Sequence, residues 1–150
     1  MRLISLFLLS VLAGCTPGAP AAGAASAAVA ATTIDVSLTS SPAAATAYGN
    51  AGGYAPLVTD VALGSTVRFL NVDSFAHTAS SLSGTSFPPS SPFTGAALNQ
   101  SGGTLSGGWT SGTLSPNGAS QPLLADKTGT YLYGCFFHYG SPMRGAIVVR

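Results

Sequence analysis

The feature that most constrains this chain is a ligand-bearing segment near the C-terminus. Cys135, His138 and Met143 follow one another there with the spacing Cys-x2-His-x4-Met. An alternating apolar run, residues 131–135, leads into the segment, and the apolar residues 146–149 follow it, which predicts a short loop between two β-strands. Thiolate, imidazole and thioether donors suit copper rather than magnesium or calcium. The rest of the chain must supply one further ligand and a rigid framework.

Few other residues could bind such a metal. The chain holds two Cys, two His and two Met. Met1 is the initiator and Cys15 belongs to a leader described below, which leaves His77 as the fourth candidate ligand. Two imidazoles, a thiolate and a weak axial thioether are the donor set of a blue-copper site. Taken singly, a Cys near a C-terminal strand is more often a small buried apolar residue, and a lone His a surface or core residue. The combination favours copper.

Two segments make the chain resemble the cupredoxins, and more closely their plastocyanin-like branch. They are residues 64–78, which end in His77-Thr78, and residues 129–149, which hold the Cys-x2-His-x4-Met spacing. The resemblance covers most of residues 33–150. It implies an all-β fold, an antiparallel Greek-key sandwich of about seven or eight strands. It also implies one copper ion, bound by His77, Cys135, His138 and Met143.

Further residues are expected to support those ligands. In the family, the residue after the first His ties its strand to the Cys loop. That position is Thr78 here, where plastocyanins commonly carry Asn. Asn71 and Asp73 are placed to brace the segment that ends at His77. Phe136 would exclude water from the thiolate, although ordinary core packing explains this residue equally well.

Composition supports a small all-β domain and argues against other classes. Only 6% of the residues are charged, and the formal net charge is +1. No basic patch is available to bind nucleic acid, and amphipathic helical stretches are lacking. An immunoglobulin-like sandwich is the alternative fold, because Tyr133-Gly134-Cys135 resembles its Tyr-x-Cys. That fold requires a second Cys on an earlier strand, and residues 16–134 contain no Cys.

The expected strands are short and alternate with turns. Strands are expected at residues 32–38, 54–62, 66–72, 120–125, 131–136 and 145–149. Pro56 weakens the second of these as a continuous strand. Residues 80–117 are rich in Gly, Ser, Thr and Pro, and their short strands cannot be placed from the sequence, although Trp109 is expected in the core.

Residues 1–14 are interpreted as a lipoprotein signal peptide. Arg2 precedes an apolar run, residues 3–12, that is too short to span a bilayer. The sequence Leu12-Ala13-Gly14-Cys15 resembles the bacterial lipobox, which implies a lipid on Cys15. An ordinary secretory signal with a fortuitous Cys is the alternative.

Residues 15–32 are then the lipidated Cys and an Ala/Gly/Pro-rich tether, and residues 33–150 the copper-binding domain. The expected location is the cell envelope, on its periplasmic or extracellular side. There the lipid would hold the protein to a membrane, which is the outer membrane if the cell is Gram-negative.

The expected function is electron transport rather than enzymatic catalysis. By resemblance, a monomer would exchange electrons with a redox protein donor and acceptor that dock near His138. Because the chain carries so few charged residues, docking should depend only weakly on salt concentration. Copper storage or delivery is the alternative function. Copper enzymes of this superfamily use additional His-rich centres, which two His cannot supply.

Overall fold

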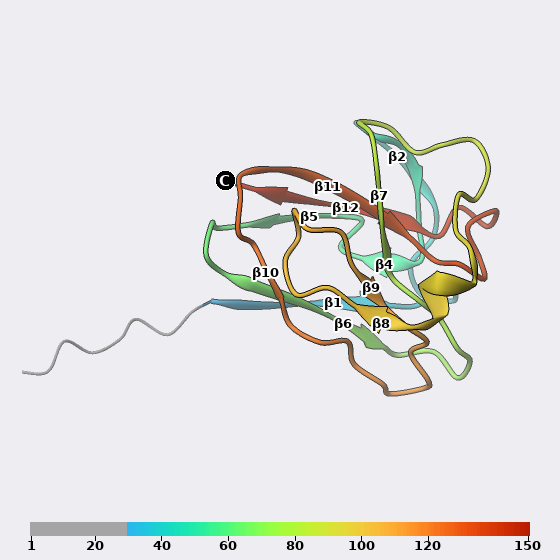
Figure 1. Ribbon diagram of the computed structural model, residues 1–150. Helices are drawn as coiled ribbons and strands as arrows, with labels where there is room; N and C mark the ends of the chain where they lie inside the picture. The colour runs from blue at the N-terminus through green and yellow to red at the C-terminus, as the bar shows by residue number, and fades with distance from the viewer. Residues whose placement is uncertain (1–29) are drawn as a thin grey trace, which may run out of the picture.

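The computed structural model describes residues 30–150, and strands dominate this part of the chain (Figure 1). The proposed signal peptide, Cys15 and nearly all of the tether lie outside the described residues. A single 3-10 helix, η1 (Gly95–Leu98), is found within them. The strands are β1 (Ala31–Val36), β2 (Ala44–Thr46), β3 (Gly49–Ala51), β4 (Tyr54–Ala55), β5 (Val58–Val61), β6 (Thr66–Asn71), β7 (Ser80–Leu82), β8 (Gln100–Ser101), β9 (Thr110–Ser111), β10 (Leu123–Leu124), β11 (Gly129–Gly134) and β12 (Arg144–Val149). None of the helical structure described is long and apolar enough to cross a membrane.

The strands form two packed sheets, which confirms the expected all-β sandwich. One sheet has the order β10-β6-β1-β4 and the other β5-β12-β11-β7-β9-β8, while β2 and β3 form a small separate ribbon. Figure 1 shows β1 and β6 in one layer and the β11–β12 hairpin in the other. Buried residues of both sheets belong to one hydrophobic cluster. The core therefore lies between the layers.

Two details of the expected sandwich need correction. The strand pairs β1–β6 and β5–β12 are parallel, so both sheets are mixed rather than purely antiparallel. The described residues also contain twelve strands instead of seven or eight. Several of these strands are only two or three residues long, which is too short for an alternating pattern to reveal them.

Alternation of side chains explains the two central strands of the first sheet. In β1, Ile34 and Val36 are buried while Asp35 between them is exposed. In β6, Val67 and Phe69 are buried on the same side of the sheet, and Ile34 lies opposite Phe69 in the parallel register. Successive side chains of a strand point to opposite faces, so both strands place their apolar residues in the core.

The strand expected at residues 54–62 is divided between the two sheets. Its first part, β4, pairs with β1, and its second part, β5, pairs with β12 in the other sheet. Pro56 lies between the two parts and follows a cis peptide bond. Proline has no N–H to donate to a strand ladder, so the break falls at a residue that cannot continue the pairing.

Four aromatic rings form the centre of the core. Tyr54 and Tyr133 meet edge to face at a centroid separation of 4.8 Å, and Phe69 stacks on Trp109 at 5.3 Å. Phe69 also contacts Tyr133 at 5.0 Å, which joins the two pairs. Such ring pairs add to the stabilisation that burial provides. Trp109 is only 4% exposed, as the sequence predicts.

Candidate metal centre

The hairpin β11–β12 delivers three of the candidate ligands. Its antiparallel pairing runs up to Gly134 and Arg144, and Cys135 extends it by donating its N–H to the carbonyl of Met143 at 3.0 Å. The carbonyl of His138 accepts the N–H of Met143 at 3.2 Å. The loop expected between two strands is therefore present, and its own backbone hydrogen bonds hold it in shape.

The fourth candidate ligand lies on the segment that connects β6 of one sheet with β7 of the other. His77 follows β6 after a turn, and its backbone exchanges two hydrogen bonds with Leu114, at 3.1 and 2.8 Å. The buried amide of Asn71 donates to the carbonyls of Phe75 and Leu114 at 2.8 and 2.9 Å. Its oxygen accepts the N–H of Asp73 at 2.9 Å. Asn71 thus holds the turn that places His77.

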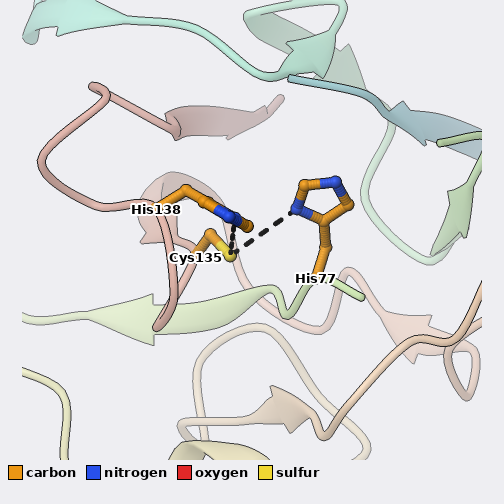
Figure 2. A group of neighbouring side chains, drawn as sticks. All are labelled: His77, Cys135 and His138. Carbon is orange, nitrogen blue, oxygen red and sulfur yellow. Dashed lines mark hydrogen bonds between the residues drawn. The ribbon is translucent and has the colours of Figure 1, made fainter. Parts of the chain in front are cut away.

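The two imidazoles converge on one sulfur (Figure 2). Nδ1 of His138 lies 3.7 Å from Sγ of Cys135, and Nδ1 of His77 lies 3.9 Å from the same atom. The three ligand atoms all lie within 4.8 Å of one another. The structure therefore brings together three of the four residues singled out in the sequence.

These separations fit a shared metal ion. Metal bonds of about 2.3 Å to a thiolate and about 2.0 Å to an imidazole put sulfur and nitrogen about 3.7 Å apart across a trigonal angle. The observed distances of 3.7 and 3.9 Å agree with that value. The donor set of one thiolate and two imidazoles is suited to soft and borderline metals. The residues present thus fit a copper ion.

Burial divides the candidate ligands into two kinds. His77, Cys135 and Met143 are fully buried, at 0% exposure, while His138 is only half-buried. Phe75, 38% exposed, packs its ring against His77 at 4.8 Å and against His138 at 5.6 Å. The site is therefore closed on the protein side and reaches the surface at the edge of His138.

Thr78 connects the segment of His77 with the loop of Cys135. Its N–H points at Sγ of Cys135 at 3.4 Å, and its hydroxyl oxygen accepts the N–H of Phe136 at 2.8 Å. An N–H directed at the sulfur stabilises negative charge there. The half-buried ring of Phe136 packs edge to face on Phe137 at 5.3 Å.

Met143 stands at the end of the same loop with its side chain against Gly53. A Cβ atom added to Gly53 would lie 2.4 Å from Cγ of Met143 and 3.2 Å from its sulfur. Gly53 also has a left-handed backbone, with φ of +72°. Both facts favour glycine at this position. The close approach leaves Met143 little room to move.

Asp73, which the sequence places to brace the segment that ends at His77, contacts the imidazole of His77 itself. Its carboxylate lies 2.9 Å from Nε2 of the imidazole, in a buried pair. The only available signal was the i, i+4 spacing. Burial acts to raise the pKa of Asp73, but hydrogen bonds from Thr39, Ser37, His77 and the N–H of Leu38 outweigh it and lower the pKa to about 2. The carboxylate is therefore ionised at neutral pH.

The pKa of His138 is shifted by burial and by two neighbouring side chains. Burial lowers the pKa of its imidazole below the ordinary value, the neighbouring His77 lowers it further, and Asp73 acts in the opposite direction. A lowered pKa keeps the ring neutral at physiological pH, which leaves a nitrogen lone pair free to bind a metal.

Fold and site together define a β-sandwich with a buried Cys-His-His cluster and a methionine in the same loop. No family model matches the chain, and no curated protein sequence matches it. Solved structures to which the chain is similar include a cupredoxin, a pseudoazurin and variants of amicyanin. One is a purple cupredoxin from Nitrosopumilus maritimus, at 21% identity and a TM-score of 0.48, covering 79% of this chain and 99% of that one.

Two further neighbours are similar to the same degree. A pseudoazurin from Sinorhizobium meliloti has 20% identity and a TM-score of 0.48, covering 81% of this chain and 75% of that one. A variant of amicyanin in its Cu(I) form has 17% identity and a TM-score of 0.47, covering 80% and 82%. Similarity at this level does not identify the chain, so the assignment of the site rests on its own geometry.

Proposed function

We propose that this protein is a type 1 (blue) copper protein that carries electrons between redox partners in the cell envelope. The observation that supports this best is the pair of imidazole Nδ1 atoms facing one buried sulfur at 3.7 and 3.9 Å. Their distances suit a shared metal ion, and the two rings come from separate segments, the β6–β7 connection and the β11–β12 loop. Bound copper would supply a one-electron couple between Cu(II) and Cu(I).

Each ligand has a distinct role in this proposal. Cys135 would bind copper as a thiolate, His77 and His138 would each supply an imidazole nitrogen, and Met143 would supply a weaker thioether donor that tunes the reduction potential. Backbone hydrogen bonds within the β11–β12 loop restrain the positions of Cys135, His138 and Met143. Two further backbone hydrogen bonds, to Leu114, restrain His77. Restrained ligands change geometry little when the charge of the site changes, which keeps the barrier to electron transfer low.

Electrons would enter and leave at the edge of His138. Its ring is the one ligand that reaches the surface, and the exposed rings of Phe75 and Phe137, at 38% and 44%, lie beside it. The partners would be a redox protein donor and acceptor, and the protein would act as a monomer. Apolar side chains and scarce charge suit brief docking that depends weakly on ionic strength.

The site supports a carrier better than the alternative of copper storage or delivery. A protein that releases its metal to a partner needs ligands that the partner can reach. Here His77, Cys135 and Met143 are fully buried. Within residues 30–150, one cluster of three or more His, Cys or carboxylate side chains could hold a metal. We propose a carrier without enzymatic activity of its own.

The location in the envelope rests on the leader sequence. Residues 1–14 would be removed as a lipoprotein signal peptide, and Cys15 would carry the lipid that anchors the domain through the tether of residues 15–32. The anchored domain would face the periplasm or the exterior. Mass spectrometry of protein made in a bacterial host tests this: acyl chains on an N-terminal Cys15 are expected, and an unmodified N-terminus would contradict the anchor.

The function is tested by spectroscopy of the protein loaded with Cu(II), beside a Cys135→Ser variant. We expect an intense visible band from charge transfer between thiolate and copper, with narrow copper hyperfine splitting, and neither in the variant. A pale protein with ordinary tetragonal Cu(II) signals, unchanged by the substitution, would overturn the proposal and favour copper delivery.

A further inference from the structure

Asp73 is the one buried carboxylate of this protein. The chain has four acidic residues, and Asp35, Asp60 and Asp126 are exposed, whereas Asp73 is only 7% exposed. A buried charge is costly unless it is paired and hydrogen-bonded. Four donors meet this requirement: the hydroxyls of Ser37 (2.8 Å) and Thr39 (2.5 Å), the N–H of Leu38 (2.7 Å) and Nε2 of His77 (2.9 Å).

The contact with His77 determines which ring nitrogen is free. An ionised carboxylate can only accept hydrogen bonds, and a neutral imidazole carries one N–H. The nitrogen that faces Asp73 must therefore hold the proton, and Nδ1, which faces Sγ of Cys135 at 3.9 Å, keeps its lone pair. We propose that Asp73 is a positioning residue, which fixes His77 in the Nε2–H tautomer and so presents Nδ1 to the metal. This inference rests on the proposed metal site.

Asp73, the hydrogen-bond acceptor for His77, is itself held in place from two sides. Asn71 accepts the N–H of Asp73 at 2.9 Å, on the β6 side. The loop after β1 supplies three of the four donors, and Ser37 in that loop donates its own N–H to the carbonyl of Gly53 at 2.9 Å. The carboxylate therefore cannot turn away from the imidazole without breaking the hydrogen bonds that Ser37, Leu38 and Thr39 donate to it.

His138 has a different environment. Within residues 30–150, the ion pairs involve Asp73 with His77 and Asp60 with Arg150, so no carboxylate is paired with His138. One imidazole is thus fixed by a buried anion, and the other is left at the surface. A carboxylate behind a ligating imidazole makes that ligand more basic, and its fixed negative charge favours the more highly charged Cu(II) state.

The first test uses the metal-free, 15N-labelled full chain at a pH of about 8, where a free imidazole is neutral. NMR of the wild type should show His77 as a single Nε2–H tautomer, with a downfield ring proton that exchanges slowly with water. In Asp73→Asn, that proton should move upfield and exchange faster. Asp60→Asn, which removes an exposed carboxylate, should leave the His77 signals unchanged.

The second test measures copper binding and the reduction potential of the same three proteins. Loss of such a partner typically weakens metal affinity by about 10–100-fold, and Asp73→Asn should weaken Cu(II) binding more than Cu(I) binding. A tenfold difference between the two states raises the potential by about 59 mV. Asp60→Asn should match the wild type.

Two results would overturn the role of Asp73. One is a wild-type His77 protonated on Nδ1, a measurement that needs no variant and so stands even if Asp73→Asn does not fold. The other is an Asp73→Asn protein with the tautomer, ring-proton exchange and potential of Asp60→Asn. Failure of the proposed function is distinguishable, because it appears as a wild type without the thiolate-to-copper band, whereas the tautomer is read in metal-free protein.

Discussion

The N–H of Thr78 points at the sulfur of Cys135 at 3.4 Å, although the two residues are 57 positions apart in the chain. The same threonine accepts the N–H of Phe136 through its hydroxyl. One residue therefore links the segment that carries His77 to the loop that carries the other candidate ligands. Its two contacts use different atoms, so mutation can separate them.

Replacing Thr78 by valine should destabilise the protein and loosen the site. Valine keeps the shape and the backbone N–H but leaves the N–H of Phe136 without its acceptor, at a cost of about 1–3 kcal/mol. Thr59→Val is the matched control, because Thr59 is buried and its hydroxyl has no hydrogen-bond partner. Chemical denaturation should show a loss for Thr78→Val and little change for Thr59→Val. Equal effects of the two substitutions would contradict a linking role.

A methyl group at Gly53 should disturb Met143. In Gly53→Ala the added Cβ would overlap Cγ of Met143, 2.4 Å away, at a φ of +72°. Gly64→Ala separates the two effects, because Gly64 has a similar φ of +83° but nothing within 4 Å of its Cβ position. We expect a strain cost of about 1 kcal/mol at Gly64, and a larger loss at Gly53.

The spectrum of the copper-loaded protein reports on the same pair of variants. Gly53→Ala should change the ratio of its visible bands and its EPR parameters, because the displaced Met143 is the proposed axial ligand. Gly64→Ala should keep the wild-type spectrum. A Gly53→Ala protein with an unaltered spectrum would argue that Met143 does not influence the metal.

Replacing Met143 by leucine should raise the reduction potential while the blue colour remains. The swap conserves volume, so it costs less than about 1.5 kcal/mol of stability. Removing the thioether would withdraw the proposed donor to Cu(II), which would leave Cu(I) relatively favoured. Leu123→Met, a comparable exchange of a buried residue on β10, is the control. Voltammetry should show a raised reduction potential for Met143→Leu and an unchanged potential for Leu123→Met. A lower potential, or none of the colour, would contradict an axial role.

The stability of the metal-free protein should fall in acid because of Asp73. Its pKa is about 2 in the folded protein against an ordinary value of 3.8, so the unfolded chain binds this proton more tightly. The contribution of the carboxylate, about 2 kcal/mol, is therefore complete above a pH of about 4 and is lost as the pH falls toward 2.

Urea unfolding across this pH range checks the acid prediction. The free energy of unfolding of the wild type should decline below a pH of about 4, whereas Asp73→Asn should start lower and decline less. Asp60→Asn should follow the wild type, since Asp60 is exposed. Parallel curves for wild type and Asp73→Asn would show that another group causes the acid loss.

Local pattern was enough to predict the elements nearest the site. The alternation of Ile34 and Val36 and that of Val67 and Phe69 predict β1 and β6, since each strand has one buried face. The hairpin around Cys135 follows from two neighbouring apolar runs. Residues 80–117 resisted prediction because their strands, among them β8 and β9, are two or three residues long and carry no period.

The sequence by itself determined which side chains could bind a metal. It contains so few His, Cys and Met residues that the set His77, Cys135, His138 and Met143 follows from their number and spacing. Cys135, His138 and Met143 share one loop, so a local turn is enough to bring them near one another. Asn71, Asp73 and Thr78 could be named because they lie close to His77 in the chain.

Only the tertiary structure decided what these residues touch. The sulfur of Cys135 meets Thr78 and His77 because β7, which follows them, pairs with β11, which precedes Cys135. The partners are 57 and 58 positions apart in the chain. Asp73 became a buried acceptor for His77 because the loop after β1, more than 30 positions earlier, closes over it with its own donors. Such contacts depend on long-range packing, which a local pattern of residues does not encode.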